Sequence, residues 1–400
     1  MMNKLKSNGE VFTPVYLIND MIDKLPTDVW GNPDLKWLDP CAGIGNFPIV
    51  IIERLMIGLK DIIEDADDRK RHILKNMIYM VEIDAGNCNE IKKAFEGYDI
   101  NLYECSYINT GNLYKGKNNA LLFDFKFDII VANPPYQYNK IEGVKSNRIW
   151  DKFVKYSYSL IKEAGYLLFV HPCGWRDLAG LTRFIFNYNK DNNLIYLNMN
   201  TYKAGLKVFG VSTNYDYYLV QNVKCNDNIT RINDIYNEEY DINLNEWVFI
   251  PSAMFNEVKK LIDGVEKVDL IFSSSKYDTR KKDFPFVNYE TEFPCVYTMS
   301  KSVGIVCKYA IRDVGHFGVP KLIFSNGKGD PYVDYDGKYG LTPFSFAIGD
   351  DPANLQLIKD AVMSKAFLKI MSCCIFKKLN TYNYKVFRTF KKDFYKAFIQ

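Results

Sequence analysis

The run Phe127-Asp128-Ile129-Ile130-Val131-Ala132-Asn133-Pro134-Pro135-Tyr136 lies in the first half of the chain. Its apolar part, Phe127–Ala132, predicts a buried strand. Each of the two prolines holds φ at about −65°, removes an amide donor and keeps the preceding residue out of the helical region. The sequence therefore predicts a strand that ends in a rigid, extended loop, at the edge where open α/β sheets place their ligands.

The sequence on both sides of this run alternates short apolar segments with helical patterns. Further buried strands are predicted at Leu35–Asp39, Met77–Ile83, Gly165–Val170 and Tyr215–Val220, with Ile195–Met199 paired to the last of them near the sheet edge. Apolar residues recur at helical spacing in Val15–Leu25, Ile49–Leu59, Asn89–Phe95 and Trp150–Ile161. This alternation predicts an α/β fold with a parallel, doubly wound, Rossmann-like sheet.

The residue composition and the length of the apolar runs change after about Asn222. Gly, Asp and Asn clusters become frequent and the apolar runs become short and aromatic, as in Phe284-Pro285-Phe286. We therefore predict two domains, residues 1–222 and residues 223–400, the second of mixed α+β character. The acidic insertion Asp61–Arg71 is predicted to be a surface loop or a helix extension in the first domain.

The composition excludes several classes of protein. Hydrophobic residues make up 48% and charged residues 25%, which is typical of a soluble globular chain. The nine cysteines have no regular spacing, which argues against a disulfide framework. No histidine stands at metal-ligand spacing from another histidine or a cysteine pair, so we expect no metal. The sequence lacks a long apolar run and a signal-peptide core, so we expect no membrane association and a cytoplasmic protein.

Charge is distributed unevenly along the chain. The net charge of +3 does not by itself indicate a nucleic-acid ligand. Residues 361–400, however, hold nine Lys or Arg and a single acid, Asp393, which leaves about eight positive charges there. A solvated face is the equally weighted alternative. The candidate phosphate contacts are Lys377, Lys378, Lys385, Arg388, Lys391 and Lys392.

The loop after Ala132 offers two hydrogen-bond acceptors and an aromatic ring. The Asn133 side-chain oxygen and the Pro134 carbonyl can take the two hydrogens of an exocyclic amine, whose lone pair then becomes available for attack. Tyr136 can stack on the face of a base. A plain Asn-Pro-Pro turn, Pro135 included, is the alternative to this reading.

A second loop has the composition of a ligand-binding turn. It reads Asp39-Pro40-Cys41-Ala42-Gly43-Ile44-Gly45-Asn46-Phe47 and joins a predicted strand to a helix. Gly43 and Gly45 permit a tight turn and the close approach of a ligand, while Asp39 can pair with a cationic amine. At the tip of the next predicted strand, a carboxylate suits a ribose diol. The family resemblance described below assigns this role to Glu82, and a lone surface glutamate is the alternative.

These motifs carry a resemblance to a known family. Asn133–Tyr136 resembles the catalytic motif of amino-methyltransferases, and the leading asparagine favours adenine because enzymes acting on cytosine N4 more often begin with serine. Asp39–Phe47 looks like the S-adenosylmethionine (AdoMet) loop of adenine methyltransferases. The order of the motifs over residues 9–222 is similar to the gamma group, and in particular to the Eco57I-type and TaqI-like DNA methyltransferases.

The resemblance implies further site residues. Thr13 and Pro14 match the segment that closes over the methionine end of AdoMet, and Pro40, Ala42 and Ile83 fall within the cofactor motifs. Asn112 stands where the family has an aspartate beside the cofactor adenine, with Glu104 as a competing candidate. Phe209 is expected to sandwich the target base with Tyr136, although a core phenylalanine is the alternative there.

The activity that the resemblance implies is methyl transfer from AdoMet to the N6 amine of an adenine flipped out of double-stranded DNA. The second domain would recognise the target sequence, and a cognate restriction endonuclease is a candidate partner. Two alternatives stay open. One is an RNA adenine or protein glutamine methyltransferase that uses the same Asn-Pro-Pro-Tyr site, and the other is a non-catalytic DNA-binding specificity subunit.

Overall fold

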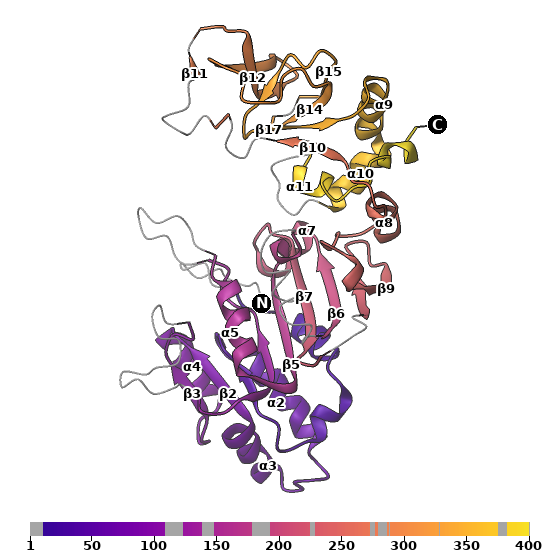
Figure 1. The fold of residues 1–400 in the computed structure, drawn as a ribbon. Helices are drawn as coiled ribbons and strands as arrows, with labels where there is room; N and C mark the ends of the chain where they lie inside the picture. The colour runs from indigo at the N-terminus through magenta and orange to yellow at the C-terminus, as the bar shows by residue number, and fades with distance from the viewer. Residues whose placement is uncertain are drawn as a thin grey trace. The chain divides into compact units, whose positions relative to one another are not determined.

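The computed structural model describes most of the chain. The described residues are 11–108, 123–137, 148–177, 193–224, 229–272, 277–278, 286–287, 289–327, 329–374 and 382–399. The chain divides into two compact units, shown in Figure 1. The first comprises Met1–Trp175 and Ala179–Trp247, and the second comprises Arg176–Leu178 and Val248–Gln400.

A single mixed sheet forms the centre of the first unit. Its strands follow the order β3-β2-β1-β4-β5-β7-β6-β8-β9 within the described residues. Their bounds are β1 Trp37–Asp39, β2 Ile78–Glu82, β3 Asn101–Glu104, β4 Phe127–Ala132, β5 Ile161–Pro172, β6 Asn193–Asn200, β7 Tyr215–Gln221, β8 Ile229–Asn233 and β9 Glu239–Asn243.

The strands from β3 to β5 are parallel, whereas β7 runs antiparallel between β5 and β6. Every strand named from the sequence is present, and the pairing of β6 with β7 is confirmed. The predicted α/β class with a Rossmann-like sheet is also confirmed. The short strand β3 was not predicted, since Asn101–Glu104 is only half-buried and lacks a continuous apolar run.

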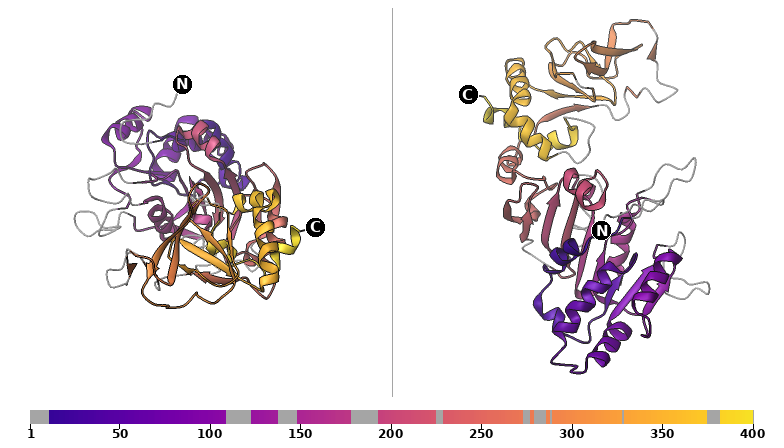
Figure 2. Two further views of the ribbon diagram at one scale, coloured as in Figure 1. Left: turned by 90° about the horizontal axis from the view of Figure 1, so that it is seen from above. Right: turned by 180° about the vertical axis from the view of Figure 1, so that it is seen from behind.

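Helices cover both faces of this sheet. Their bounds are α1 Val15–Ile22, η1 Thr27–Gly31, α2 Asn46–Gly58, α3 Ala66–His72, the π-helical turn η2 Ile73–Met77, α4 Ala85–Ala94, α5 Trp150–Leu160, η3 Cys173–Arg176, α7 Tyr202–Phe209 and η4 Leu244–Glu246. Figure 1 shows α5 in front of the sheet, and the opposite view in Figure 2 shows the indigo helices of residues 15–58 in front. The acidic insertion forms the short helix α3, which begins on the side chain of Asp65.

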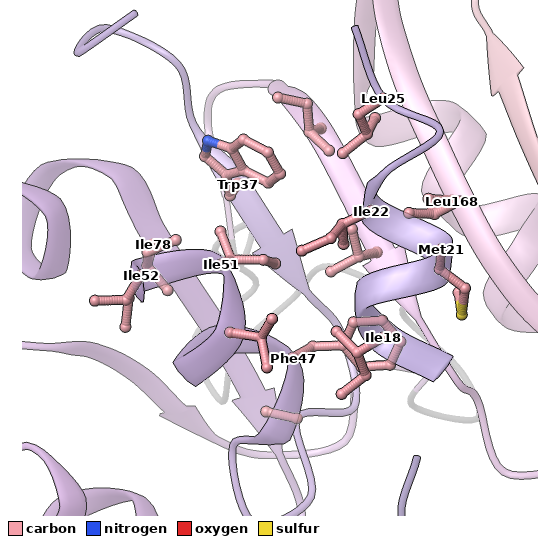
Figure 3. Close-up of a cluster of buried hydrophobic side chains, with 14 of the residues drawn as sticks. Ile18, Met21, Ile22, Leu25, Trp37, Phe47, Ile51, Ile52, Ile78 and Leu168 are labelled. Atoms are coloured by element: carbon pink, nitrogen blue, oxygen red, sulfur yellow. The ribbon is translucent and has the colours of Figure 1, made fainter. Parts of the chain in front are cut away.

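The face that carries α1 and α2 holds the main core. Figure 3 shows Ile18 and Met21 of α1 near Phe47 of α2 and Leu168 of β5. Alternate residues of a strand point to the same face, so Leu168 and Val170 join this core while Leu167 and Phe169 point to the other face. Each fully buried aliphatic side chain contributes about 1.5–3 kcal/mol. This packing holds the carboxyl ends of β1 and β4 in place.

Two strands extend the first unit beyond the predicted boundary at residue 222. The strand β8 pairs in parallel with β6, and β9 then pairs with β8 as an antiparallel hairpin. The compact unit therefore ends at Trp247 rather than at residue 222. The sequence signal failed here because β9 is half-exposed and polar, so it lacks the apolar alternation of a covered strand.

The second unit packs two four-stranded sheets against each other. The strand orders are β10-β17-β14-β15 and β11-β13-β12-β16 within the described residues. Buried apolar side chains from both sheets meet between them, including Val296, Ile323 and Leu341. The bounds are β10 Asp269–Phe272, β11 Phe286–Val287, β12 Phe293–Ser300, β13 Gly304–Ala310, β14 Lys321–Ser325, β15 Tyr332–Asp334, β16 Gly340–Leu341 and β17 Ser345–Gly349.

The C-terminal helices cover the other face of the sheet β10-β17-β14-β15. These are α9 Pro352–Met363, α10 Lys365–Cys373, α11 Tyr384–Phe387 and η5 Phe394–Ala397, with α8 Phe255–Ile262 earlier in the unit. Phe324 and Phe346 stack with ring centroids 4.8 Å apart, and Phe387 packs on both rings. The mixed α+β character predicted for the second half is therefore present.

Candidate active site

The carboxyl ends of β1 and β4 bring the two predicted loops together. β1 lies between β2 and β4, with Leu38 opposite Ile130. The loop after Asp39 and the loop after Ala132 consequently leave the sheet side by side, at the edge where open α/β sheets bind ligands.

Asn133 presents one end of its side-chain amide to a protein partner and leaves the other end available. Its Nδ2 donates a hydrogen bond to the Thr13 hydroxyl at 3.0 Å. Its Oδ1 is buried and accepts no hydrogen bond from any described residue. A buried acceptor without a donor costs about 1–3 kcal/mol, so this oxygen is poised to receive a hydrogen from a bound molecule.

The rest of the loop is anchored on both sides of Tyr136. Pro134 is buried and Pro135 is exposed. The carbonyl of Tyr136 accepts from the Ile149 amide at the start of α5, and Gln137 pairs with Arg148 in an antiparallel bridge. Burial raises the pKa of Tyr136, and Tyr215 adds to the shift. The phenol is therefore neutral.

Phe209 lies in the core rather than on an open face. It ends α7, is 1% exposed and contacts Tyr215 edge-on with ring centroids 4.9 Å apart. Its ring stands at 86° to that of Tyr136, at a centroid distance of 6.5 Å. A base held between parallel rings would require Phe209 to turn, so its stacking role stays a prediction.

Asp39 is a buried carboxylate with one oxygen unused. Its Oδ1 accepts from the Cys41 amide at 3.1 Å, and its Oδ2 has no donor among the described residues. Burial raises the pKa of Asp39 to about 8; the Cys41 amide opposes that rise and the charge of Glu82 adds to it. A cationic amine would supply the counter-charge that this carboxylate lacks.

The loop after Asp39 needs its glycines. Gly43 has φ of 55° and Gly45 has φ of 91°, in the left-handed region that glycine occupies without strain. A Cβ on Gly43 would lie 3.1 Å from the ring of Phe12. Gly45 is the N-cap of α2 without a side chain to cap it, so the first amides of that helix are accessible to an acceptor. Pro40 and Ala42 are buried beside it.

Glu82 is tied to the same loop. Its Oε2 accepts from the Gly43 amide at 2.8 Å, and its Oε1 accepts from the amides of Ile83 and Asp84. A carboxylate has about four acceptor positions, so one remains for a ribose hydroxyl. Ile83 beside it is 72% exposed and offers an apolar surface. Glu104 ends β3 and pairs with Lys92 of α4.

Thr13 connects the N-terminal segment to both loops. It is 4% exposed, and its carbonyl accepts from Nδ2 of Asn46 at 2.9 Å. Pro14 follows as the N-cap of α1. Sequence reasoning missed Asn46, although its place in the loop motif was a signal. It also missed the contact of Thr13 with Asn133, which no local pattern indicates across 120 positions.

Three predicted residues, Asn112, Lys377 and Lys378, lie outside the described part of the chain. Of the other basic candidates, Lys385 and Lys391 are half-buried, whereas Arg388 and Lys392 are exposed. The guanidinium of Arg388 lies 5.0 Å from the ring centroid of Phe272. The basic segment is thus the outer side of an apolar helical layer.

Within the described ranges, no group of His, Cys, Asp and Glu side chains is arranged to hold a metal ion. None of the helices in those ranges is long and apolar enough to cross a membrane.

Comparison with known proteins yields a family match over part of the chain. Residues 53–203 match the model of the Eco57I restriction-modification methylase family. This match includes the Asn133–Tyr136 motif and confirms the resemblance to Eco57I-type methylases.

A curated relative from Mycoplasma pneumoniae, described as an uncharacterized adenine-specific methylase, is 29% identical over 42% of this chain. The match spans 56% of that relative's length. Among solved structures, the EcoKI M protein of a type I restriction enzyme is similar with a TM-score of 0.41 and 16% identity, over 56% of this chain and 48% of that one. A type I methyltransferase subunit from Streptococcus thermophilus has a TM-score of 0.39 and 13% identity, over 57% and 48%.

Proposed function

We propose that this chain is a site-specific DNA methyltransferase that transfers a methyl group from AdoMet to the N6 amine of adenine. The observation that carries the proposal is the buried Oδ1 of Asn133, beside a loop that holds the buried Oδ2 of Asp39; neither oxygen has a donor among the described residues. One oxygen suits an amine hydrogen and the other suits a cationic amine. The Eco57I-family match over residues 53–203 supports the reaction class.

The residues at the carboxyl ends of β1 and β2 have the chemistry needed to bind AdoMet. Asp39 would pair with its α-amine, Glu82 would accept from its ribose, and the exposed Ile83 would pack against its adenine. Gly43 and Gly45, with the neighbouring Pro40 and Ala42, leave room for the amino-acid part, and Thr13 and Pro14 border it. When bound, AdoMet supplies an electrophilic methyl group on its sulfonium.

Asn133 and Pro134 would act on the acceptor amine. Oδ1 of Asn133 takes one amine hydrogen and the Pro134 carbonyl takes the other, which draws the nitrogen toward tetrahedral geometry and restores its lone pair. Both acceptors are held by the rigid loop before the substrate arrives, so they cost no reorganisation during the reaction. Tyr136 supplies a ring face for the base, and Phe209 would complete the sandwich after turning.

Double-stranded DNA is the proposed substrate because the curated relative is described as adenine-specific and the matched family is one of restriction-modification methylases. A base inside a duplex is out of reach, so the target adenine must be flipped out. The second unit would recognise the sequence, with Arg388 and Lys392 as phosphate contacts. A cognate restriction endonuclease is the proposed biological partner.

The test is methyl transfer from labelled AdoMet to unmethylated duplex DNA, followed by nucleoside analysis. We expect N6-methyladenine from the wild-type chain. Asn133→Ala should bind AdoMet normally but lose about 10²–10³-fold in turnover, the usual cost of removing one preorganised electrostatic contact. Asn89→Ala, on the exposed side of α4 in the first unit, is the matched control and should keep full activity. Undiminished turnover in Asn133→Ala would refute the mechanism.

Parallel assays on RNA and on protein glutamine separate the alternatives. If RNA or protein glutamine is labelled and DNA is not, the proposed substrate is wrong, but the proposed active-site residues stand. AdoMet and DNA binding without transfer to any acceptor would identify a non-catalytic specificity subunit instead.

A further inference from the structure

Three segments that are far apart in the sequence meet at Thr13. Its hydroxyl accepts from Nδ2 of Asn133 at 3.0 Å, and its backbone carbonyl accepts from Nδ2 of Asn46 at 2.9 Å. The residue is 4% exposed and stands two positions before α1, whose apolar side is buried in the main core. The backbone of Thr13 is therefore held in place on both sides, which limits the positions that its hydroxyl can take.

The amide of Asn133 has two ends of almost equal shape and opposite chemistry. Its oxygen accepts hydrogen bonds, whereas its nitrogen carries two hydrogens to donate. Only the oxygen end is useful toward an amine, because two donors facing each other leave both groups unpaired. A 180° turn of the amide would thus reverse the preference of the site from an amine to a carbonyl.

We propose that Thr13 is a positioning residue that selects which end of Asn133 faces the substrate. A hydroxyl could pair with either end of the amide, but once its own hydrogen is donated to a ligand oxygen it can only accept. It then pairs only with the Nδ2 end of Asn133, as in this structure, and leaves the buried Oδ1 for the amine. Asn46 fixes Thr13 from the cofactor loop. This inference rests on the proposed function and deepens it, because it assigns selectivity for an amine over a carbonyl to a residue outside the Asn-Pro-Pro-Tyr loop.

This role is separate from the cofactor contact expected of Thr13. A hydroxyl can accept one hydrogen bond and still donate its own hydrogen. One of its two acceptor lone pairs takes the hydrogen of Asn133, and the O–H can be donated to a ligand oxygen. The two roles therefore predict different losses: a cofactor contact changes AdoMet affinity, whereas amide positioning changes turnover and base discrimination.

The experiment uses the full chain and the DNA site mapped from wild-type methylation. Turnover and AdoMet affinity are measured for the wild type, for Thr13→Val, which keeps the shape and removes the hydroxyl, and for Thr13→Ser, which keeps the hydroxyl. DNA affinity is measured for duplexes with adenine or hypoxanthine at the target, since hypoxanthine replaces the amine by a carbonyl oxygen. Thr13→Ala and melting temperatures separate a folding defect from these readouts.

We expect Thr13→Val to lose about tenfold in turnover, the equivalent of one hydrogen bond, with AdoMet affinity within about threefold of wild type. Its preference for adenine over hypoxanthine should fall by about tenfold. Thr13→Ser should behave as wild type in every readout. Thr13→Ala should follow Thr13→Val.

Full turnover in Thr13→Val, or lost turnover with unchanged discrimination between the two bases, would overturn the positioning role. A loss confined to AdoMet affinity would restrict Thr13 to cofactor binding. A wild-type chain that methylates no DNA would refute the proposed function itself, and this inference with it, so the two failures are distinguishable.

Discussion

Asp39 and Asp334 are both buried carboxylates, one in each unit of the chain. Asp334 accepts from Nζ of Lys321 at 2.9 Å and from the amides of Lys338 and Tyr339, and Lys321 is itself fully buried. Asp39 has one amide donor, and its second oxygen has none among the described residues. Asp334 thus has partners for both oxygens, whereas Asp39 has a partner for only one.

The difference separates a structural polar group from one kept for a ligand. A buried charge is stable when it is paired and hydrogen-bonded, and it is costly when it is not. The second unit meets that requirement within its own fold. In the described part of the first unit, Oδ2 of Asp39 and Oδ1 of Asn133 lack donors at the same sheet edge, which is the arrangement expected where a bound molecule supplies the missing partners.

The largest effect should come from breaking the completed network. Lys321→Met leaves Asp334 buried without its counter-charge, so the free energy of unfolding of the second unit should fall by about 3–5 kcal/mol. Urea denaturation measures the change. Lys301→Met is the control, because the Lys301–Asp330 pair is exposed and should contribute at most about 1 kcal/mol. Equal losses in the two variants would remove the contrast between the units.

Neutralising Asp39 should have the next largest effect, a loss of AdoMet affinity. Asp39→Asn should weaken AdoMet binding by about 2 kcal/mol or more, because the α-amine loses its counter-charge. Titration calorimetry measures the affinity. Wild-type affinity should also rise between pH 6 and about 7.5, where the free amine is still protonated, since Asp39 with a pKa of about 8 must lose a proton to form the pair. A flat profile would contradict this account.

The same substitution should stabilise the ligand-free chain. Burial raises the pKa of Asp39 from 3.8 to about 8, so above pH 4 the unfolded chain has released a proton that the folded chain retains. Stability is therefore lost as pH rises through this window, and Asp39→Asn removes the loss. We expect a higher melting temperature for the ligand-free variant, with the largest gain near pH 8.

The smallest effect should come from the exposed charges of the second unit. Arg388→Gln and Lys392→Gln should each lower DNA affinity modestly and reduce the slope of log affinity against log salt by about 1. Fluorescence anisotropy at several salt concentrations measures that slope. Lys60→Gln, an exposed site in the first unit, is the control. Unchanged slopes in the first two variants would assign the basic helices to solvation alone.

Local chemistry allowed much of the candidate site to be predicted. Pro134 and Pro135 restrict backbone angles by covalent geometry, and Gly43 and Gly45 occupy conformations that few other residues adopt. Such effects act on immediate neighbours, so the ends of β4 and β1 could be found from sequence. The strand β9 and the hairpin it forms with β8 could not, because polar half-exposed residues show no period.

The sequence by itself determined the alternation of strands and helices, the two ligand loops and the resemblance to Eco57I-type methylases. Only the tertiary structure decided that Thr13 holds Asn133, that Glu82 holds Gly43 and that Phe209 is buried. The reason is physical: steric limits on φ and ψ are fixed within a few residues, whereas burial and hydrogen-bond partners depend on which distant segments pack together.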